Sequence, residues 1–125
     1  MKKILGCTLV AVLISATLMS QPAKKELRHV VLFGWKANVT SGAIDSAVTA
    51  FRALSGPIKT IKKLEWGTNN SPENLNQGLT HCFILTFASE KDRDDYLVHP
   101  AHKAFAQLLT NKLDRVTVVD FWAQP

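Results

Sequence analysis

The sequence predicts a single α+β domain in which strands and helices follow one another in the order β-α-β-β-α-β. The chain has 125 residues, which is too short for two independent hydrophobic cores. Four apolar runs with strand character alternate with segments whose apolar residues recur at helical spacing. With 46% hydrophobic and 20% charged residues, the composition is that of a folded domain and not of a disordered chain.

Residues 1–23 are predicted to be a cleaved signal peptide that precedes the folded domain. Two lysines follow the initiator methionine, and an uncharged run then extends from Ile4 to Met19. This run of 16 residues is a little short for a bilayer span and ends in small and polar residues. We expect cleavage after Ser20 or Ala23. The remaining domain, 24–125, is then periplasmic or secreted and keeps no stable membrane association.

Two alternatives stay open for this segment, because it can persist as an uncleaved anchor or be lipidated at Cys7. Cys7 lies before the hydrophobic run, whereas a lipoprotein cleavage box follows it. Without the two signal-peptide lysines, 13 basic residues face 10 acidic ones, and none forms a basic stripe. We therefore expect no nucleic-acid partner. Cys82 would be the single remaining cysteine, and its apolar surroundings predict a small buried hydrophobe rather than a reactive thiol.

The first strand is predicted over residues 27–37, which are rich in Val, Phe and Trp. Alternation divides its side chains between two faces. One face carries His29, Val31, Phe33 and Trp35, and the other carries Val30, Leu32 and Gly34. Because both faces are largely apolar, we expect this strand to be buried on both sides.

A helix follows, with Ser41 as its predicted N-cap and Gly56–Pro57 as its end. Its apolar stripe consists of Ile44, Ala47, Val48, Phe51 and Leu54. Residues 61–68 predict a weaker second strand. The polar, turn-rich stretch 69–78 predicts a loop.

The clearest strand signal is at residues 79–88, which are again apolar on both faces. His81, Phe83, Leu85 and Phe87 share one face, and Thr80, Cys82, Ile84 and Thr86 share the other. Ser89 is a suitable N-cap for a short helix to about Val98, and Pro100 favours the first turn of a new helix. One face of that helix carries His102, Phe105, Ala106 and Leu109. Residues 115–123 complete the chain as a fourth strand.

This order is the ferredoxin-like arrangement, in which helices cover one face of a four-stranded antiparallel sheet. The other face would carry Val30, Leu32 and Ile84, together with Cys82. A monomer would leave these apolar side chains in water. We therefore expect a homodimer in which two such sheet faces pair to form a barrel.

Three histidines are predicted to converge between the sheet and its helices. Strand alternation directs His29 and His81 toward the helices, and the helical spacing directs His102 back toward the sheet. They would form the polar end of an apolar, ligand-sized pocket, to which Tyr96 could add a phenol. The expected apolar lining is Phe33, Phe51, Phe83, Leu85 and Phe105. Each histidine can instead be a hydrogen-bonded core residue.

Other chemistries find little support in the sequence. His99 and His102 have a spacing seen in metal sites, but Pro100 breaks the helix and no carboxylate stands at a ligand spacing. The motifs of serine hydrolases and of phosphate-binding loops do not occur. We expect neither a metal nor a cofactor.

Several segments together resemble the stress-responsive dimeric α/β barrel (Dabb) family over residues 27–122. They are Arg28-His29-Val30-Val31-Leu32-Phe33, Trp66-Gly67, Leu79-Thr80-His81, Leu85-Thr86-Phe87 and Tyr96-Leu97-Val98-His99-Pro100-Ala101-His102. The resemblance implies a ferredoxin-like homodimer with a central barrel. It also implies similarity to a plant polyketide cyclase that closes a linear tetraketide by aldol condensation. Tyr96 and His102 would then be catalytic, with His29 and His81 lining the pocket.

Three functions therefore remain open. The protein can be an exported stress-related dimer that binds a small hydrophobic or aromatic molecule. It can be a cofactor-independent cyclase or lyase, in which His102 removes a proton next to a carbonyl and Tyr96 stabilises the oxyanion. It can also be a purely structural dimer whose histidines are satisfied in the core.

Overall fold

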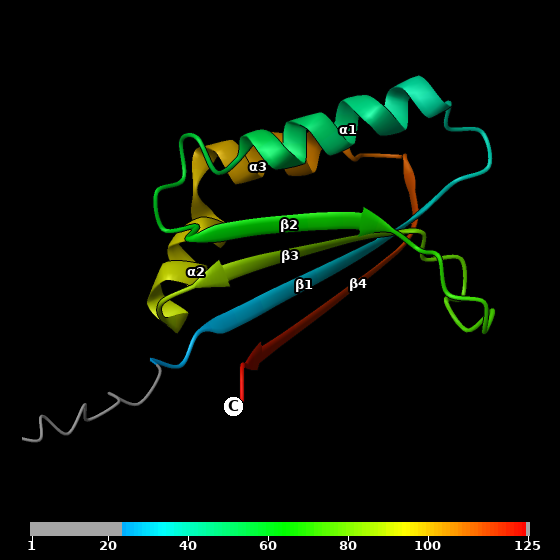
Figure 1. The fold of residues 1–125 in the computed structure, drawn as a ribbon. Helices are drawn as coiled ribbons and strands as arrows, with labels where there is room; N and C mark the ends of the chain where they lie inside the picture. The colour runs from blue at the N-terminus through cyan, green and yellow to red at the C-terminus, as the bar shows by residue number, and fades with distance from the viewer. Residues whose placement is uncertain (1–23, 125) are drawn as a thin grey trace, which may run out of the picture.

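The computed structural model describes residues 24–124, which form the predicted ferredoxin-like α+β fold (Figure 1). The elements are β1 (Leu27–Trp35), α1 (Ser41–Ala53), β2 (Lys63–Thr68), β3 (His81–Phe87), α2 (Glu90–Val98), α3 (Pro100–Leu108) and β4 (Leu113–Trp122). The predicted signal peptide lies outside the described residues. Within residues 24–124, no helix combines the length and the apolar character needed to cross a membrane.

The four strands form one antiparallel sheet in the order β2-β3-β1-β4, and the helices lie on one side of it (Figure 1). The predicted break in the second helical segment is confirmed. His99 ends α2 and also caps α3, where its Nδ1 accepts a hydrogen bond from the amide of Ala101 at 3.1 Å. Pro100 occupies the first turn of α3. Its lack of an amide hydrogen costs nothing there, because the first amides of a helix have no partner within the helix.

Several element boundaries differ from the predicted ones by one to three residues, and two of these differences have clear local reasons. The N-cap of α1 is Thr40 and not Ser41, because the Thr40 hydroxyl accepts a hydrogen bond from the amide of Ala43 at 3.2 Å. β4 begins at Leu113, two residues before the predicted start at residue 115. Leu113 pairs with Trp35 across a bulge, which lengthens the ladder with β1.

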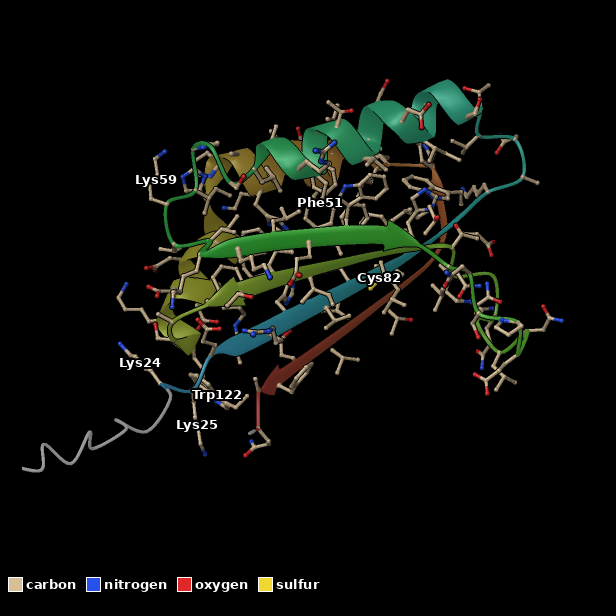
Figure 2. The ribbon with its side chains drawn as sticks, in the orientation of Figure 1. Lys24, Lys25, Phe51, Lys59, Cys82 and Trp122 are labelled. Carbon is tan, nitrogen blue, oxygen red and sulfur yellow. The ribbon has the colours of Figure 1, made fainter. Side chains whose placement is uncertain are left out.

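The predicted alternation of the strands is confirmed on the helix-covered face. Phe51 of α1 is fully buried and points toward the sheet, where its ring stacks on Phe83 with centroids 4.1 Å apart (Figure 2). On the opposite face, Val30, Leu32 and Ile84 are only partly buried. The expectation that β1 is buried on both sides is therefore wrong for the described part of the single chain, because no helix within residues 24–124 covers this second face.

The predicted loop over residues 69–78 is confirmed, and it closes against the sheet at Gly34. A Cβ atom at Gly34 would lie 2.7 Å from the backbone oxygen of Gly78, closer than real contacts allow. Gly78 itself has a φ of 80°, which favours glycine. Directly after the loop, the amide of Thr80 donates to the carbonyl of Phe33 at 2.9 Å. The missing side chain at Gly34 thus permits this close approach.

We expect Gly34→Ala to lower the free energy of unfolding by about 1–3 kcal/mol, because the new methyl group meets backbone that cannot move aside cheaply. Urea denaturation of the purified domain measures this difference. Gly67→Ala is the matched control, since a Cβ there has no neighbour within 4 Å. The control should change stability by about 0.5 kcal/mol at most. Equal stability of the two variants would refute a tight loop–sheet contact.

Candidate functional site

A cavity of about 520 Å³ lies between the inner face of β1 and β4 on one side and α2 and α3 on the other. It exists because β4 is an edge strand, and none of the helices in the described part of the chain packs closely over it. Val116 and Val118, on the inner face of β4, are 52% and 51% exposed. The apolar walls are built mainly by Val31, Phe33, Phe51, Phe105, Leu109, Val116 and Val118. The volume lies within the range of small-molecule sites.

The polar end of the cavity is built around a pair formed by His29 of β1 and Asp120 of β4. These residues are direct cross-strand partners, and His29 Nδ1 lies 2.6 Å from Asp120 Oδ1. The other carboxylate oxygen of Asp120 accepts a hydrogen bond from Arg93 of α2. Because a carboxylate only accepts, the hydrogen-bond network assigns a proton to Nδ1 of His29. When His29 is neutral, its Nε2 is then a bare acceptor at the cavity.

The charge of Asp120 is maintained by these two partners. Partial burial alone would raise the pKa of the Asp120 carboxyl, but hydrogen bonds from Arg93 and His29 outweigh burial and lower it. Asp120 therefore stays ionised at neutral pH and remains a hydrogen-bond acceptor for the Nδ1–H group of His29.

His102 of α3 presents a second acceptor to the same end of the cavity. Its Nδ1 donates to the carbonyl oxygen of Leu97 at 3.1 Å, which leaves Nε2 without a proton in the neutral ring. Partial burial lowers the pKa of His102 and outweighs the hydrogen bond to Leu97, which raises it, and the nearby His29 lowers it further. His102 is therefore neutral at pH 7 and available as a base.

Tyr96 of α2 supplies the donor. Its ring centroid lies 4.4 Å from that of His102 and 5.6 Å from that of His29. Tyr96 is 1% exposed, and this burial raises the pKa of its phenol well above the ordinary value. The hydroxyl is consequently protonated at physiological pH. The cavity end thus combines one O–H donor with two imidazole acceptors, a set able to hold a carbonyl group beside an acidic proton.

The structure brings together only part of the predicted pocket. His29, Tyr96 and His102 line the cavity, as do Phe33, Phe51 and Phe105. Phe83 and Leu85 do not line it, because β3 lies on the far side of β1 from β4 and both residues are fully buried under the helices.

His81 also lies apart, so the predicted convergence of three histidines is wrong. His81 pairs with Phe33. His29 lies four residues before Phe33 in β1, which separates the two positions by about 13 Å at the usual rise of a strand. Trp35 donates its indole N–H to His81 Nδ1 at 3.0 Å. Partial burial lowers the pKa of His81, which keeps this acceptor unprotonated. His81 thus satisfies a tryptophan at the opposite end of the sheet.

Sequence reasoning missed Asp120 and Arg93. A signal for Asp120 was present, because it alternates with Val116 and Val118 and must share their inward face. A partly buried carboxylate needs a hydrogen-bonding or charged partner, and His29 was already predicted on the same, helix-facing side of the sheet. Arg93 had no comparable signal, since it belongs to a short, highly charged helix with little amphipathic pattern.

Among residues 24–124, no three or more His, Cys, Asp or Glu side chains are grouped so that they could hold a metal ion. His99 uses its Nδ1 as a helix cap, and His102 uses its Nδ1 on the Leu97 carbonyl. Cys82 lies on the face opposite the cavity, where partial burial raises the pKa of its thiol.

Plant proteins are among the relatives that match most of this chain. A stress-response A/B barrel domain-containing protein of Arabidopsis thaliana is 37% identical over 81% of this chain and 93% of its own length. Olivetolic acid cyclase of Cannabis sativa is 24% identical over 76% of this chain and 94% of its own.

Solved structures share the fold over most of the chain. An Arabidopsis thaliana protein at 35% identity has a TM-score of 0.75 and covers 79% of this chain and 96% of its own. The hydroxynitrile lyase of Passiflora edulis, at 23% identity, has a TM-score of 0.76 with coverages of 81% and 95%. A dimeric ferredoxin-like protein of Jannaschia, at 26%, has a TM-score of 0.64 with coverages of 77% and 97%. The profile of the Stress responsive A/B Barrel Domain (Dabb) family matches residues 27–123, and this chain belongs to that family.

Proposed function

We propose that this protein is an exported homodimer that binds a small, largely apolar or aromatic molecule bearing a carbonyl or hydroxyl group. The observation that carries the proposal is the cavity of about 520 Å³, whose walls are apolar and whose single polar end combines Tyr96, His102 and the His29–Asp120 pair. Such a cavity removes an apolar body from water and orients its one polar group. One sequence relative is named olivetolic acid cyclase and one structural neighbour hydroxynitrile lyase, and both names refer to enzymes of small organic molecules.

The dimer is proposed to form through the sheet face that the helices leave uncovered. Three neighbouring strands place Ile84, Val30 and Val119 in one row across this face, with Val119 52% exposed. Leu32 lies in the next row, and Phe121 is 48% exposed nearby. Pairing with a second copy would remove these side chains from water. A dimeric ferredoxin-like neighbour supports the formation of a homodimer, and the choice of face rests on these exposed side chains.

Export is proposed from the sequence of residues 1–23 alone, with its two lysines and uncharged run of 16 residues. The described domain is compatible with an oxidising compartment, because it contains one cysteine and relies on its hydrophobic core for stability.

A second candidate function is acid–base catalysis on a carbonyl compound, and the tautomer of His102 favours it. Its unprotonated Nε2 is the atom free to take a proton from the carbon next to a carbonyl. The Tyr96 hydroxyl can donate to the oxygen on which negative charge develops. The resulting enolate carbon can attack a second carbonyl of the same molecule and close a ring. The alkoxide formed from that carbonyl then takes the proton back from the His102 imidazolium. These steps need only the residues of this chain.

We expect aromatic aldehydes, ketones and phenols to raise the melting temperature of the domain, in a thermal-shift screen, through binding at the cavity. A ligand at about one hundred times its Kd adds about 2.7 kcal/mol of stability, which corresponds to a shift of about 10 °C or more. His102→Ala should abolish the shift. His81→Gln is the matched control and should retain it, since His81 lies outside the cavity. Shifts that survive in His102→Ala would place binding elsewhere. The absence of any shift would favour a structural role for the histidines.

We expect the wild-type domain to elute as a dimer in light-scattering chromatography and Leu32→Asp to elute as a monomer or to aggregate. The substitution places an unpaired carboxylate in an apolar interface, which costs several kcal/mol. Leu108→Asp provides the control, because Leu108 is 52% exposed on α3, on the helix side of the sheet. A Leu32→Asp protein that remained dimeric would disprove this interface.

If the cavity is catalytic, the protein should accelerate exchange of the methyl hydrogens of acetophenone for deuterium in D₂O, followed by proton NMR. Removal of the base in His102→Ala should lower the rate by about 100-fold or more, and Tyr96→Phe should also slow it. Burial lowers the pKa of His102, so the base form persists below pH 6.5 and the rate should fall only in more acidic solution. A rate that already falls as the pH drops from 8 to 7 would identify a different base.

A further inference from the structure

We propose that Arg93 is a positioning residue for the polar end of the cavity, because it orients Asp120 and thereby fixes the tautomer of His29. The inference deepens the proposed function and rests on it for its importance to the ligand. The tautomer itself is a property of the free protein, however, and can be tested without any ligand.

The geometry connects three elements in one chain of hydrogen bonds. Arg93 Nη1 of α2 donates to Oδ2 of Asp120, while Oδ1 of the same carboxylate faces His29 Nδ1 at 2.6 Å. Arg93 Nε also donates to Asp94 Oδ1 at 2.7 Å. The guanidinium thus donates to two different carboxylates at once. A lysine ammonium would reproduce this arrangement poorly, because it lacks the planar, forked set of N–H donors.

Asp120 depends on this contact because of its place in the sheet. It lies on the edge strand β4, and its side chain is 26% exposed. Among residues 24–124, its only side-chain partners are His29 and Arg93. Without Arg93, the carboxylate could turn toward water, where ions are best solvated. His29 is 4% exposed and cannot follow it.

The tautomer decides what His29 offers to a ligand. With Nδ1–H held by Asp120, the neutral ring presents Nε2 as a hydrogen-bond acceptor at the cavity. If that hold is lost, the proton is free to move to Nε2, and the ring then presents a donor instead. Arg93 lies outside the cavity lining, yet it determines whether the site accepts or donates at this position.

The test is NMR of the ¹⁵N-histidine-labelled domain without ligand, at a pH where His29 is neutral. Two-bond ¹H–¹⁵N spectra distinguish a protonated from a bare ring nitrogen. Wild type should show His29 with Nδ1 protonated and Nε2 bare. Arg93→Gln should show a mixture or the reversed pattern. Arg28→Gln is the control, because Arg28 is next to His29 in β1 but pairs with Glu26, and it should retain the wild-type pattern. Wild-type signals in Arg93→Gln would overturn the proposal.

Asp120→Asn tests the same claim with an isosteric change, in case Arg93→Gln does not fold. Arg93 has only donors, so it should capture the amide oxygen of the new side chain and turn the NH₂ group toward His29. The ring must then accept at Nδ1 and carry its proton on Nε2, as a wrong tautomer arises in the serine-protease triad when its Asp is replaced by Asn. If His29 in Asp120→Asn kept Nδ1 protonated, Arg93 would not be the orienting group.

These outcomes are separate from those of the proposed function. A reversed tautomer with no ligand-induced thermal shift would support the role of Arg93 and contradict ligand binding. A ligand-induced shift with an unchanged tautomer in both variants would do the opposite.

Discussion

The antiparallel pairing of β1 with β3 on one side and with β4 on the other is the constraint on which the molecule depends. The β1–β3 side lies under α1, and there the aromatic side chains of sheet and helix pack into a closed core around Phe51 and Phe83. The β1–β4 side lies at the edge of the sheet, where the helices do not pack directly against β4 and the cavity remains between them. The same sheet therefore builds a rigid core on one side and an open cavity on the other.

The polar end of the cavity illustrates how burial and hydrogen bonding divide the roles of similar groups. His29 and His102 both lose the use of Nδ1 to a neighbouring acceptor, a carboxylate in one case and a backbone carbonyl in the other. Both consequently offer Nε2 to the cavity. Tyr96, which burial keeps protonated, offers the complementary donor. This end of the cavity therefore has separate donor and acceptor groups, although Asp120 is the one acidic or basic residue besides the histidines in its lining. The charge of Asp120 is balanced by Arg93, which lies outside the cavity.

The two sheet faces serve different purposes. The inner face carries the core and the cavity, while the outer face carries Val30, Leu32 and Val119, which no helix of the described residues covers. Because alternate residues of one strand point to opposite faces, β1 contributes to the cavity through His29 and to the proposed dimer through Val30. A dimer formed through the outer face would leave the cavity open, so assembly and ligand binding need not compete.

The sequence by itself determined the element order, the helix break at Pro100 and the face to which each strand residue points, because these follow from local periodicity, capping and the backbone chemistry of proline. It was therefore sufficient to place His29 and His102 on inward faces, whereas the short charged helix α2 has too little amphipathic pattern to direct Tyr96. Only the tertiary structure decided which inward residues meet. Strand order separated Phe83 and Leu85 from the cavity, register placed His81 beside Trp35, and the long-range pairing of β1 with β4 brought Asp120 to His29. Periodicity describes directions within one element, whereas a site needs distances between elements, and those are set by the way the sheet is assembled.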